Sequence, residues 1–276
     1  MDKTIKILII VLLSILIVGS LGAFTILFTT NGNFEMYKTS KVYDNDITEE
    51  FNAINVDTDS LDVRIIKSND EKVNVKVYDK KDNKVSIEVE NNTLNIEETV
   101  KDSICFMCGK REAIISVPEK EYDLVVQSTS GDVESRINLN NATIIVTSGD
   151  TELRKVNDLS MIVTSGDIDV EEVNNVTIVS TSGDVEIGKI NSRLDIQTIS
   201  GDIDIDDLTI TEDSKIEVIS GDVIINKTSN NFYCDAKATS GDVKVKDNDR
   251  RSEHELKIRT KSGDIIVRWE KQVYYS

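Results

Sequence analysis

Residues 168–184, IDVEEVNNVTIVSTSGD, form one complete copy of the repeat that decides the fold. The tripeptide that closes it, Ser-Gly-Asp, occurs eight times from residue 130 onward, and successive serines are 17 to 22 positions apart. A period of about 20 residues is typical of a solenoid, in which each repeat forms one coil, that is, one full turn of the chain. The serines are Ser130, Ser148, Ser165, Ser182, Ser200, Ser220, Ser240 and Ser262.

Apolar residues recur at every second position on both sides of each tripeptide. Val176 and Ile178 precede Ser182, and Val185 and Ile187 follow it. Alternation rich in β-branched residues predicts strands that are buried on one face. No single repeat can bury its apolar face alone, so the sequence predicts an all-β parallel β-solenoid whose stacked coils share one narrow core.

The tripeptide is predicted to form a corner between two strands. The serine continues the inward-facing series, where a small side chain fits a tight bend. The glycine supplies a backbone conformation that is closed to other residues, and the aspartate can hydrogen-bond the backbone of its own turn. The corner glycines are Gly131, Gly149, Gly166, Gly183, Gly201, Gly221, Gly241 and Gly263.

The first 50 residues are predicted to anchor and tether the solenoid. Residues 7–28 are strongly apolar and would be about 33 Å long as a helix, which matches a bilayer core of about 30 Å. A cleaved signal peptide is the competing interpretation, but its apolar core is usually shorter, about 7–15 residues. Two lysines in residues 1–6 favour a cytoplasmic N-terminus, with the acidic domain outside the cell membrane. Residues 29–50 show no sustained period and are predicted to be a tether.

Ordered structure is predicted to begin near Phe51. Ser60-Leu61-Asp62 lies in the same register as the later corners, with Leu in place of Gly. Residues 51–120 are therefore predicted to form a degenerate first coil and hairpins that cap the open end of the stack. Regular repeats occupy residues 121–270, and residues 271–276 form a C-terminal tail. Trp269 and the two tyrosines that follow are predicted to cap the terminal coil.

The charge of the chain excludes one class of partner. The formal net charge is −18, and no basic stripe with interleaved aromatic residues is present. A phosphate polymer would be repelled by such a surface, so nucleic acid is not an expected partner.

The three cysteines allow several interpretations. Cys105 and Cys108 form one Cys-x-x-Cys pair, which can close a small disulfide loop outside the membrane. A structural zinc site would need a second pair or nearby histidines, and the chain has only His254, so a metal site would require an oligomer. Redox activity would need the motif beside a βαβ unit, which the sequence does not show. Cys234 lies on the inward series and is predicted to be a core residue.

The aspartates that follow the corner glycines are the largest set of candidate ligands. Stacked at about 4.8 Å, neighbouring carboxylates in water would repel by roughly 0.9 kcal/mol per pair. Backbone N–H groups in the turn would offset this repulsion without any cofactor. Calcium between the carboxylates is the alternative, although the Gly-Gly-x-Gly-x-Asp nonapeptide of calcium-binding β-rolls is absent. These weak metal candidates are Asp132, Asp150, Asp167, Asp184, Asp202, Asp222, Asp242 and Asp264.

A second acidic row is predicted to point outward two residues after each corner. Its members are Glu134, Glu152, Asp169, Glu186 and Asp204. Some β-helix enzymes cleave polysaccharides with two or three aspartates, but a catalytic site should break the repeat, whereas these acids recur with it. A Ser-His-Asp triad would have to recruit His254 from a charged turn. No catalytic residue is therefore predicted.

The repeats resemble those of a known bacterial family. A strand ending in Val117-Pro118, the segment 124–133 (LVVQSTSGDV) and the serial Ser-Gly-Asp corners are similar to the putative-adhesin family of unknown function, over about residues 51–270. The resemblance implies a β-strand repeat domain behind one N-terminal membrane helix. Some members resemble LiaG-type membrane proteins, which are found beside envelope-stress signalling genes. The Cys105–Cys108 segment and Cys234 depart from the family pattern.

The expected function is non-catalytic. A single helix would hold a rod-like solenoid outside a bacterial cell membrane, where its faces would contact cell-wall polymer, an envelope protein or a neighbouring cell. The alternative is an accessory role in envelope-stress signalling through partners in the membrane.

Overall fold

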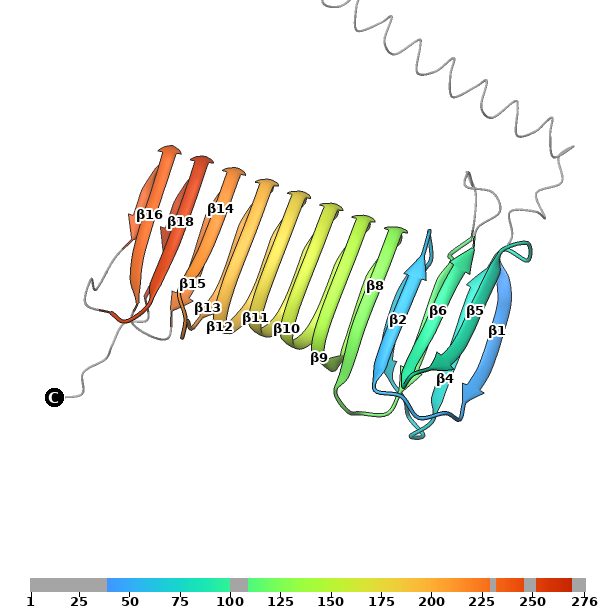
Figure 1. Ribbon diagram of the computed structural model, residues 1–276. Coiled ribbons are helices and arrows are strands. Elements are labelled where there is room, and N and C mark those ends of the chain that lie inside the picture. The colour runs from blue at the N-terminus through green and yellow to red at the C-terminus, as the bar shows by residue number, and fades with distance from the viewer. Residues whose placement is uncertain (1–38, 100–108, 229–231, 246–251, 270–276) are drawn as a thin grey trace, which may run out of the picture.

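The computed structural model describes residues 39–99, 109–228, 232–245 and 252–269, which form strands and no helix (Figure 1). The strands are β1 (Ser40–Ile47), β2 (Ala53–Thr58), β3 (Asp62–Lys67), β4 (Val73–Asp79), β5 (Lys84–Glu90), β6 (Thr93–Thr99), β7 (Glu112–Val117), β8 (Tyr122–Ser130), β9 (Val133–Ser148), β10 (Thr151–Ser165), β11 (Ile168–Ser182), β12 (Val185–Ser200), β13 (Ile203–Leu208), β14 (Ser214–Ser220), β15 (Val223–Thr228), β16 (Tyr233–Ser240), β17 (Val243–Val245), β18 (Glu255–Ser262) and β19 (Ile265–Val267). No helix among these residues could span a membrane. The predicted anchor at residues 7–28 lies outside the described residues, as do residues 1–6 and 271–276.

The chain coils into a flattened solenoid with two sheets (Figure 1). We call the strand segments that lead into the corners the pre-corner sheet, and those that leave them the post-corner sheet. The pre-corner sheet stacks β5, β6, β2, β8, the second halves of β9 to β12, β14, β18 and β16. The post-corner sheet stacks β1, β4, β7, β3, the first halves of β9 to β12, β13, β15, β19 and β17. Successive coils from β2 onward pair in parallel, which confirms the predicted parallel β-solenoid.

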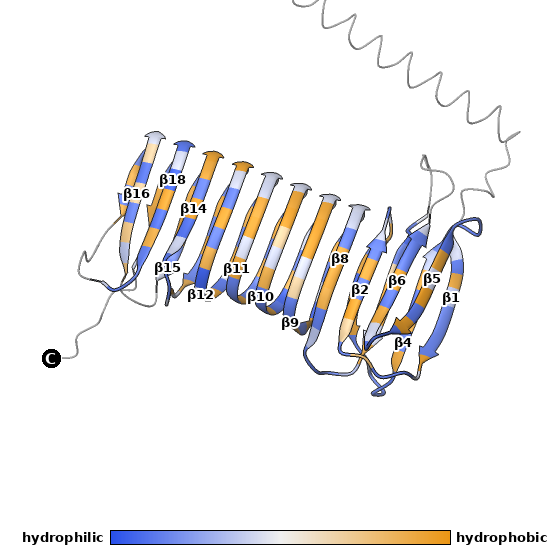
Figure 2. Cartoon of the chain, in the orientation of Figure 1, coloured by the Kyte–Doolittle hydropathy of each residue, from blue (hydrophilic) through white to orange (hydrophobic). Residues whose placement is uncertain are grey.

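Burial follows the period-two pattern of the sequence. In β11, Ile168 and Val170 are buried before a middle segment centred on the buried Val173, and Val176 and Ile178 are buried after it, while the residues next to each of these five lie toward the surface. Figure 2 shows this as alternating apolar and polar bands along the strands. Cys234 is buried as predicted, and its burial raises the pKa of the thiol to about 12.

The coils do not stack in chain order at either end. The last coil of the chain, β18 and β19, lies between the coil of β14 and β15 and the coil of β16 and β17. Likewise, the coil of β2 and β3 lies between the coil of β6 and β7 and the coil of β8 and β9. The stacking order can differ from the chain order because every coil offers the same kind of parallel edge to its neighbour. The apolar pattern determines the register of each coil but not its place in the stack. Trp269 still reaches the end coil, where its ring centroid lies 5.4 Å from that of Phe232.

The N-terminal part corrects one prediction and confirms another. Residues 40–47, placed in the predicted tether, form β1 and pair antiparallel with β4. The strand was missed because only Tyr43 and Ile47 pack against the core and a bulge between Lys41 and Tyr43 interrupts the alternation. β5 and β6 form a predicted hairpin, closed by Asn91 and Asn92 at positive φ. β4 instead pairs with β1 and β7.

The corner serines do not continue the inward series, contrary to the prediction. In β11 the last buried residue is Ser180, and both Thr181 and Ser182 are exposed. The alternation of buried and exposed residues ends at Ser180, and Ser182, the last residue of β11, is exposed next to the positive-φ Gly183.

Substitutions at these two serines test the revised assignment. We expect Ser180→Leu to lower the free energy of unfolding by about 1–3 kcal/mol, because the side chain is 2% exposed and stacks between Val163 and Thr198. Ser182→Leu should change it by less than about 0.5 kcal/mol. Equilibrium denaturant unfolding measures both, and a larger loss for Ser182→Leu would restore the original assignment.

Candidate functional site

The corners are held in a backbone conformation that only glycine adopts readily. All eight corner glycines have positive φ, between 121° and 150°. The coils also approach closely there: a Cβ built on Gly183 would lie 2.0 Å from the carbonyl oxygen of Gly166 in the preceding coil. The predicted role of the corner glycines is therefore confirmed, and close stacking adds a second reason for it.

The corner aspartates form a hydrogen-bonded ladder along the stack. The backbone N–H of Asp184 donates to Oδ1 of Asp167 at 2.9 Å, and the N–H of Asp202 donates to Oδ1 of Asp184 at 2.8 Å. The donor thus belongs to the next coil and not to the aspartate's own turn, which corrects the prediction. The ladder bonds measure 2.7 to 3.1 Å and run through Asp62, Asp132, Asp150, Asp167, Asp184, Asp202, Asp222, Asp264 and Asp242. In each bond the positive end of an N–H dipole faces a carboxylate. This attraction offsets the repulsion between neighbouring carboxylates.

An acidic groove of about 510 Å³ lies beside this ladder on the post-corner sheet. Four of the five acids of the outer row predicted from the sequence line it, all but Asp204, and Glu152, Asp169 and Glu186 are exposed. Glu134 is paired with Arg64, whose Nε lies 2.7 Å away. The carboxylates lining the groove are Asp132, Glu134, Asp150, Glu152, Asp167, Asp169, Asp184 and Glu186.

Burial raises the pKa values of two acids that lie beyond the two ends of the groove. Burial raises the pKa of the Asp62 carboxyl above its ordinary value, at the N-terminal start of the ladder. Burial, and then the charge of Asp206, raise the pKa of Asp204. Farther along the stack, the row becomes Ile224, Ile266 and Lys244, so the acidic surface ends there.

The described residues do not contain a group of side chains with the geometry of a metal site. Among the described residues, no three His, Cys, Asp or Glu side chains are grouped so that they could hold a metal ion. Calcium between the corner aspartates stays a prediction. Cys105 and Cys108 lie outside the described residues, so their disulfide also stays a prediction.

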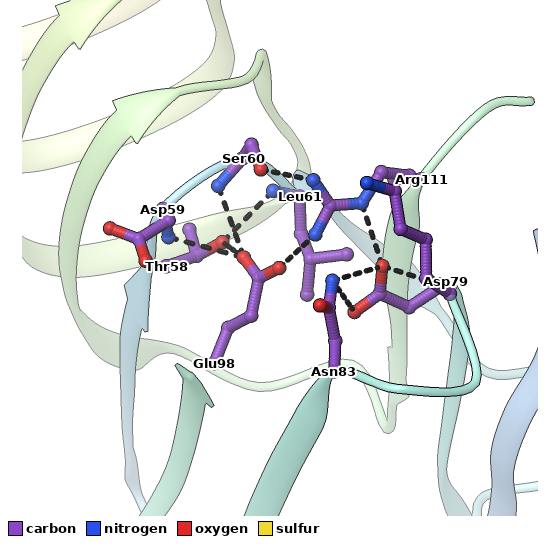
Figure 3. Close-up of polar contacts among 9 residues, drawn as sticks. Thr58, Asp59, Ser60, Leu61, Asp79, Asn83, Glu98 and Arg111 are labelled. Carbon is purple, nitrogen blue, oxygen red and sulfur yellow. Dashed lines mark hydrogen bonds and ion pairs between the residues drawn. The ribbon is translucent and has the colours of Figure 1, made fainter. Parts of the chain in front are cut away.

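A buried polar network fixes the degenerate corner, and sequence reasoning missed it (Figure 3). Arg111 donates from Nε to Asp79 Oδ1 at 2.6 Å and also donates to Glu98 and Ser60. Glu98 Oε2 in turn accepts hydrogen bonds from the Thr58 hydroxyl and from the backbone of the corner. The signal was present, because acids occupy inward positions in the series Val75-Val77-Asp79 and Leu94-Ile96-Glu98. A buried charge implies a buried partner.

Comparisons with known proteins place the chain in a family. Residues 51–268 match the model of the Toastrack DUF4097 family. The chain belongs to this family. The match covers the solenoid from β2 to β19 and agrees with the resemblance to a putative-adhesin family of unknown function. No curated protein gives a significant match to the chain.

Solved structures resemble this Toastrack chain in fold. A putative adhesin from Bacteroides fragilis NCTC 9343 has 15% identity and a TM-score of 0.53, with 83% of this chain and 99% of that chain covered. A putative adhesin from Parabacteroides merdae ATCC 43184 has 15% identity and a TM-score of 0.31, covering 84% and 97% of the two chains. A putative lipid binding protein from Parabacteroides distasonis ATCC 8503 has 14% identity and a TM-score of 0.29, covering 82% and 96%. The likeness of fold rests on the Bacteroides fragilis protein, whose TM-score is above 0.5, and at 15% identity it concerns the fold alone.

The Toastrack solenoid also carries an exposed aliphatic stripe that sequence reasoning missed. Its residues lie on the outward side of the pre-corner sheet, where polar side chains are expected. Alternation alone could not distinguish them from core residues, but aligning the repeats by their corner serines places three of them at the same offset. The exposed residues are Ile145, Ile162, Val179, Ile199 and Ile219.

Proposed function

We propose that this Toastrack protein is a non-catalytic, membrane-anchored interaction protein of the bacterial cell envelope. Its solenoid lies outside the membrane and binds a cell-wall polymer or an envelope protein. The observation that carries the proposal is the acidic groove, in which carboxylates recur at the spacing of the coils, about 4.8 Å, on a backbone fixed by the ladder. An extended partner with repeated amino groups would meet a carboxylate in each coil, and such weak contacts strengthen one another when they are linked.

The arrangement of the acids supports binding over catalysis. Glu152, Asp169 and Glu186 occupy equivalent positions in consecutive coils, so they have nearly the same surroundings. Acid and base roles require two carboxyl groups whose environments differ. A repeated row is instead suited to a repeated or extended ligand.

The membrane anchor is a proposal that rests on residues 7–28, which are apolar over a length that matches a bilayer core. Protease added to intact protoplasts should remove the solenoid and leave the anchor in the membrane. A mature N-terminus near Ala23 would instead identify a cleaved signal peptide and a secreted protein.

Neutralising the groove should weaken capture of the partner. We expect the triple variant Glu152→Gln, Asp169→Asn and Glu186→Gln, crosslinked in intact envelopes and then pulled down, to recover roughly tenfold less partner than the unmodified chain. A roughly tenfold lower recovery is what we expect when only some of the charge contacts of an interface are removed. The partner would be identified by comparing the two recovered samples.

A matched control removes three acids elsewhere. The variant Glu121→Gln, Glu212→Gln and Glu253→Gln changes the net charge equally at exposed positions outside the groove. It should recover as much partner as the unmodified chain. Equal recovery by the groove variant would show that the groove is not the binding surface.

The alternative function, an accessory role in envelope-stress signalling, is supported by the resemblance to LiaG-type proteins. The signalling role and the binding role predict different results when the gene is deleted. A stress reporter should then respond differently, and the solenoid should bind no surface polymer directly.

A further inference from the structure

The outward side of the pre-corner sheet, here called the stripe face, has an apolar centre. Ile145, Ile162 and Val179 stack in one row, since each is the register partner of the next. Their side chains are 40%, 52% and 43% exposed. Contiguous exposed aliphatic side chains are typical of surfaces that bind another molecule.

The C-terminal end of the stripe face is basic. A groove of about 670 Å³ begins at Ile199 and Ile219 and is lined farther on by Lys237, Arg259 and Lys261. Lys215 and Lys257 stand beside it in the neighbouring row. Two acids are also present: Glu217 pairs with Lys215 at 2.8 Å, and Asp235 pairs with Arg259.

The N-terminal end of the same face is acidic. A second groove of about 610 Å³ lies across β5, β6, β2 and β8, and its lining contains no Lys or Arg. The acids that line it are Asp57, Glu88, Glu90, Glu97 and Asp123. The side chains of the stripe face are therefore acidic at its N-terminal end, aliphatic at its centre and basic at its C-terminal end.

One row of register partners shows how regular this arrangement is. In stacking order the row reads Glu97, Asp57, Gln127, Ile145, Ile162, Val179, Gln197, Glu217, Arg259 and Lys237. Read from the other end, Glu97 and Asp57 exchange places with Lys237 and Arg259, and Ile162 exchanges with Val179 in the middle. The remaining positions pair Gln127 with Glu217 and Ile145 with Gln197. This is the pattern that a two-fold symmetric contact requires, because each residue then meets the one at the mirrored position.

We propose that the stripe face is a self-complementary interface between two copies of this chain. A two-fold axis that lies in the interface, parallel to the strands and midway between Ile162 and Val179, places Ile162 of one copy against Val179 of the other. The same rotation places Asp57 opposite Arg259 and Glu97 opposite Lys237, twice in each dimer. Apolar side chains then fill the centre, and charged pairs lie toward the rim, as in typical interfaces.

The area agrees with a stable dimer. With strands about 4.8 Å apart, the stripe face is roughly 50 Å long, and five residues of each strand give a width of roughly 15 Å. The product is about 750 Å² per copy, close to the roughly 800 Å² per partner of a standard interface. A purely acidic partner would match only the basic end, and a lipid chain only the stripe, whereas a second copy matches all three parts.

The interface does not depend on the proposed function, because the acidic groove belongs to the post-corner sheet. A dimer joined through the stripe face leaves both acidic grooves accessible. The two proposals can therefore fail separately.

The test uses two residues that can meet only between copies. Glu97 and Lys237 lie at opposite ends of the row, roughly 43 Å apart within one chain. Full-length chains with two different C-terminal tags are produced in the same membranes, one tag is captured, and recovery of the other is measured. Lys237→Glu or Glu97→Lys alone should lower recovery roughly tenfold, since like charges then face each other twice. The combined variant should restore it, because the charges are exchanged at both sites.

Two further variants make the result decisive. Lys244→Glu changes an exposed lysine in the same end coil but on the other sheet, and it should leave recovery unchanged. Ile162→Lys places two lysines beside the axis and should abolish recovery, while thermal melts confirm that the exposed site leaves the fold intact. Recovery that is insensitive to Lys237→Glu and Ile162→Lys overturns the proposal. Loss that the combined variant fails to restore also overturns it, and points to a different occupant.

Discussion

Gly183→Ala is expected to destabilise the centre of the solenoid by about 3 kcal/mol or more. Gly183 has a φ of 121°, a region where an alanine is strained by about 1–3 kcal/mol. Its new Cβ would also lie 2.0 Å from the carbonyl oxygen of Gly166, and backbone atoms cannot rotate away as a side chain can. Relief requires the two coils to separate, which stretches the bond from the Gly166 N–H to the Ser182 carbonyl, now 3.2 Å long. Equilibrium denaturant unfolding measures the loss.

The control for this prediction lies three residues away. Glu186→Gln changes an exposed side chain in the same coil, so it should alter the free energy of unfolding by less than about 0.5 kcal/mol. If Gly183→Ala unfolds at the same denaturant concentration as Glu186→Gln, the corner does not have the conformation described.

Local features of the sequence were sufficient to predict the repeated part of the fold. Alternation on either side of the corner determines which residues face the core, and the corner glycine marks where the strand must bend. Both features recur in each repeat, so they identified the coil from 168 to 184 and its neighbours. The prediction failed inside the corner itself, because the bend removes Ser182 from the alternation after Ser180.

The arrangement of the ends could not be predicted, since it depends on contacts between distant segments. Parallel coils offer equivalent edges, so nothing local shows that β18 lies between β14 and β16. The network around Arg111 is similar, because its partners come from β2, β4 and β6 and the turns that follow them.

The sequence predicted one of the two candidate surfaces and not the other. The acidic groove was expected because aspartate and glutamate recur at fixed offsets from the corner. The stripe face was not, because alternation alone does not distinguish the exposed Ile162 from the buried Ile178. Their offsets from the corner serine, three and four residues, do distinguish them. The opposite charges at the two ends of that face come from residues 57 to 261, which the stacking brings onto one side.

Arg111→Met is expected to lower the free energy of unfolding by about 3–5 kcal/mol. The Arg111 side chain is 10% exposed, and the carboxyl groups of Asp79 and Glu98 that it contacts are fully buried. Methionine fills a similar volume but leaves two buried carboxylates without a cation. Glu98 also accepts hydrogen bonds from the backbone N–H groups of Asp59 and Ser60, so a shift of Glu98 would loosen this corner, which has Leu61 in place of glycine.

Two comparisons separate the loss of charge pairing from other effects. Adding Asp79→Asn to Arg111→Met should recover part of the lost stability, because one of the two unpaired acids becomes neutral while its hydrogen bond from Asn83 can be kept. Arg64→Met breaks the pair with Glu134 at a site where the arginine side chain is 32% exposed, so water replaces the lost contact and the cost should stay within about 1 kcal/mol. Denaturant unfolding of the three variants gives the order directly. If Arg111→Met costs no more than Arg64→Met, the network is solvated and does not hold the first corner.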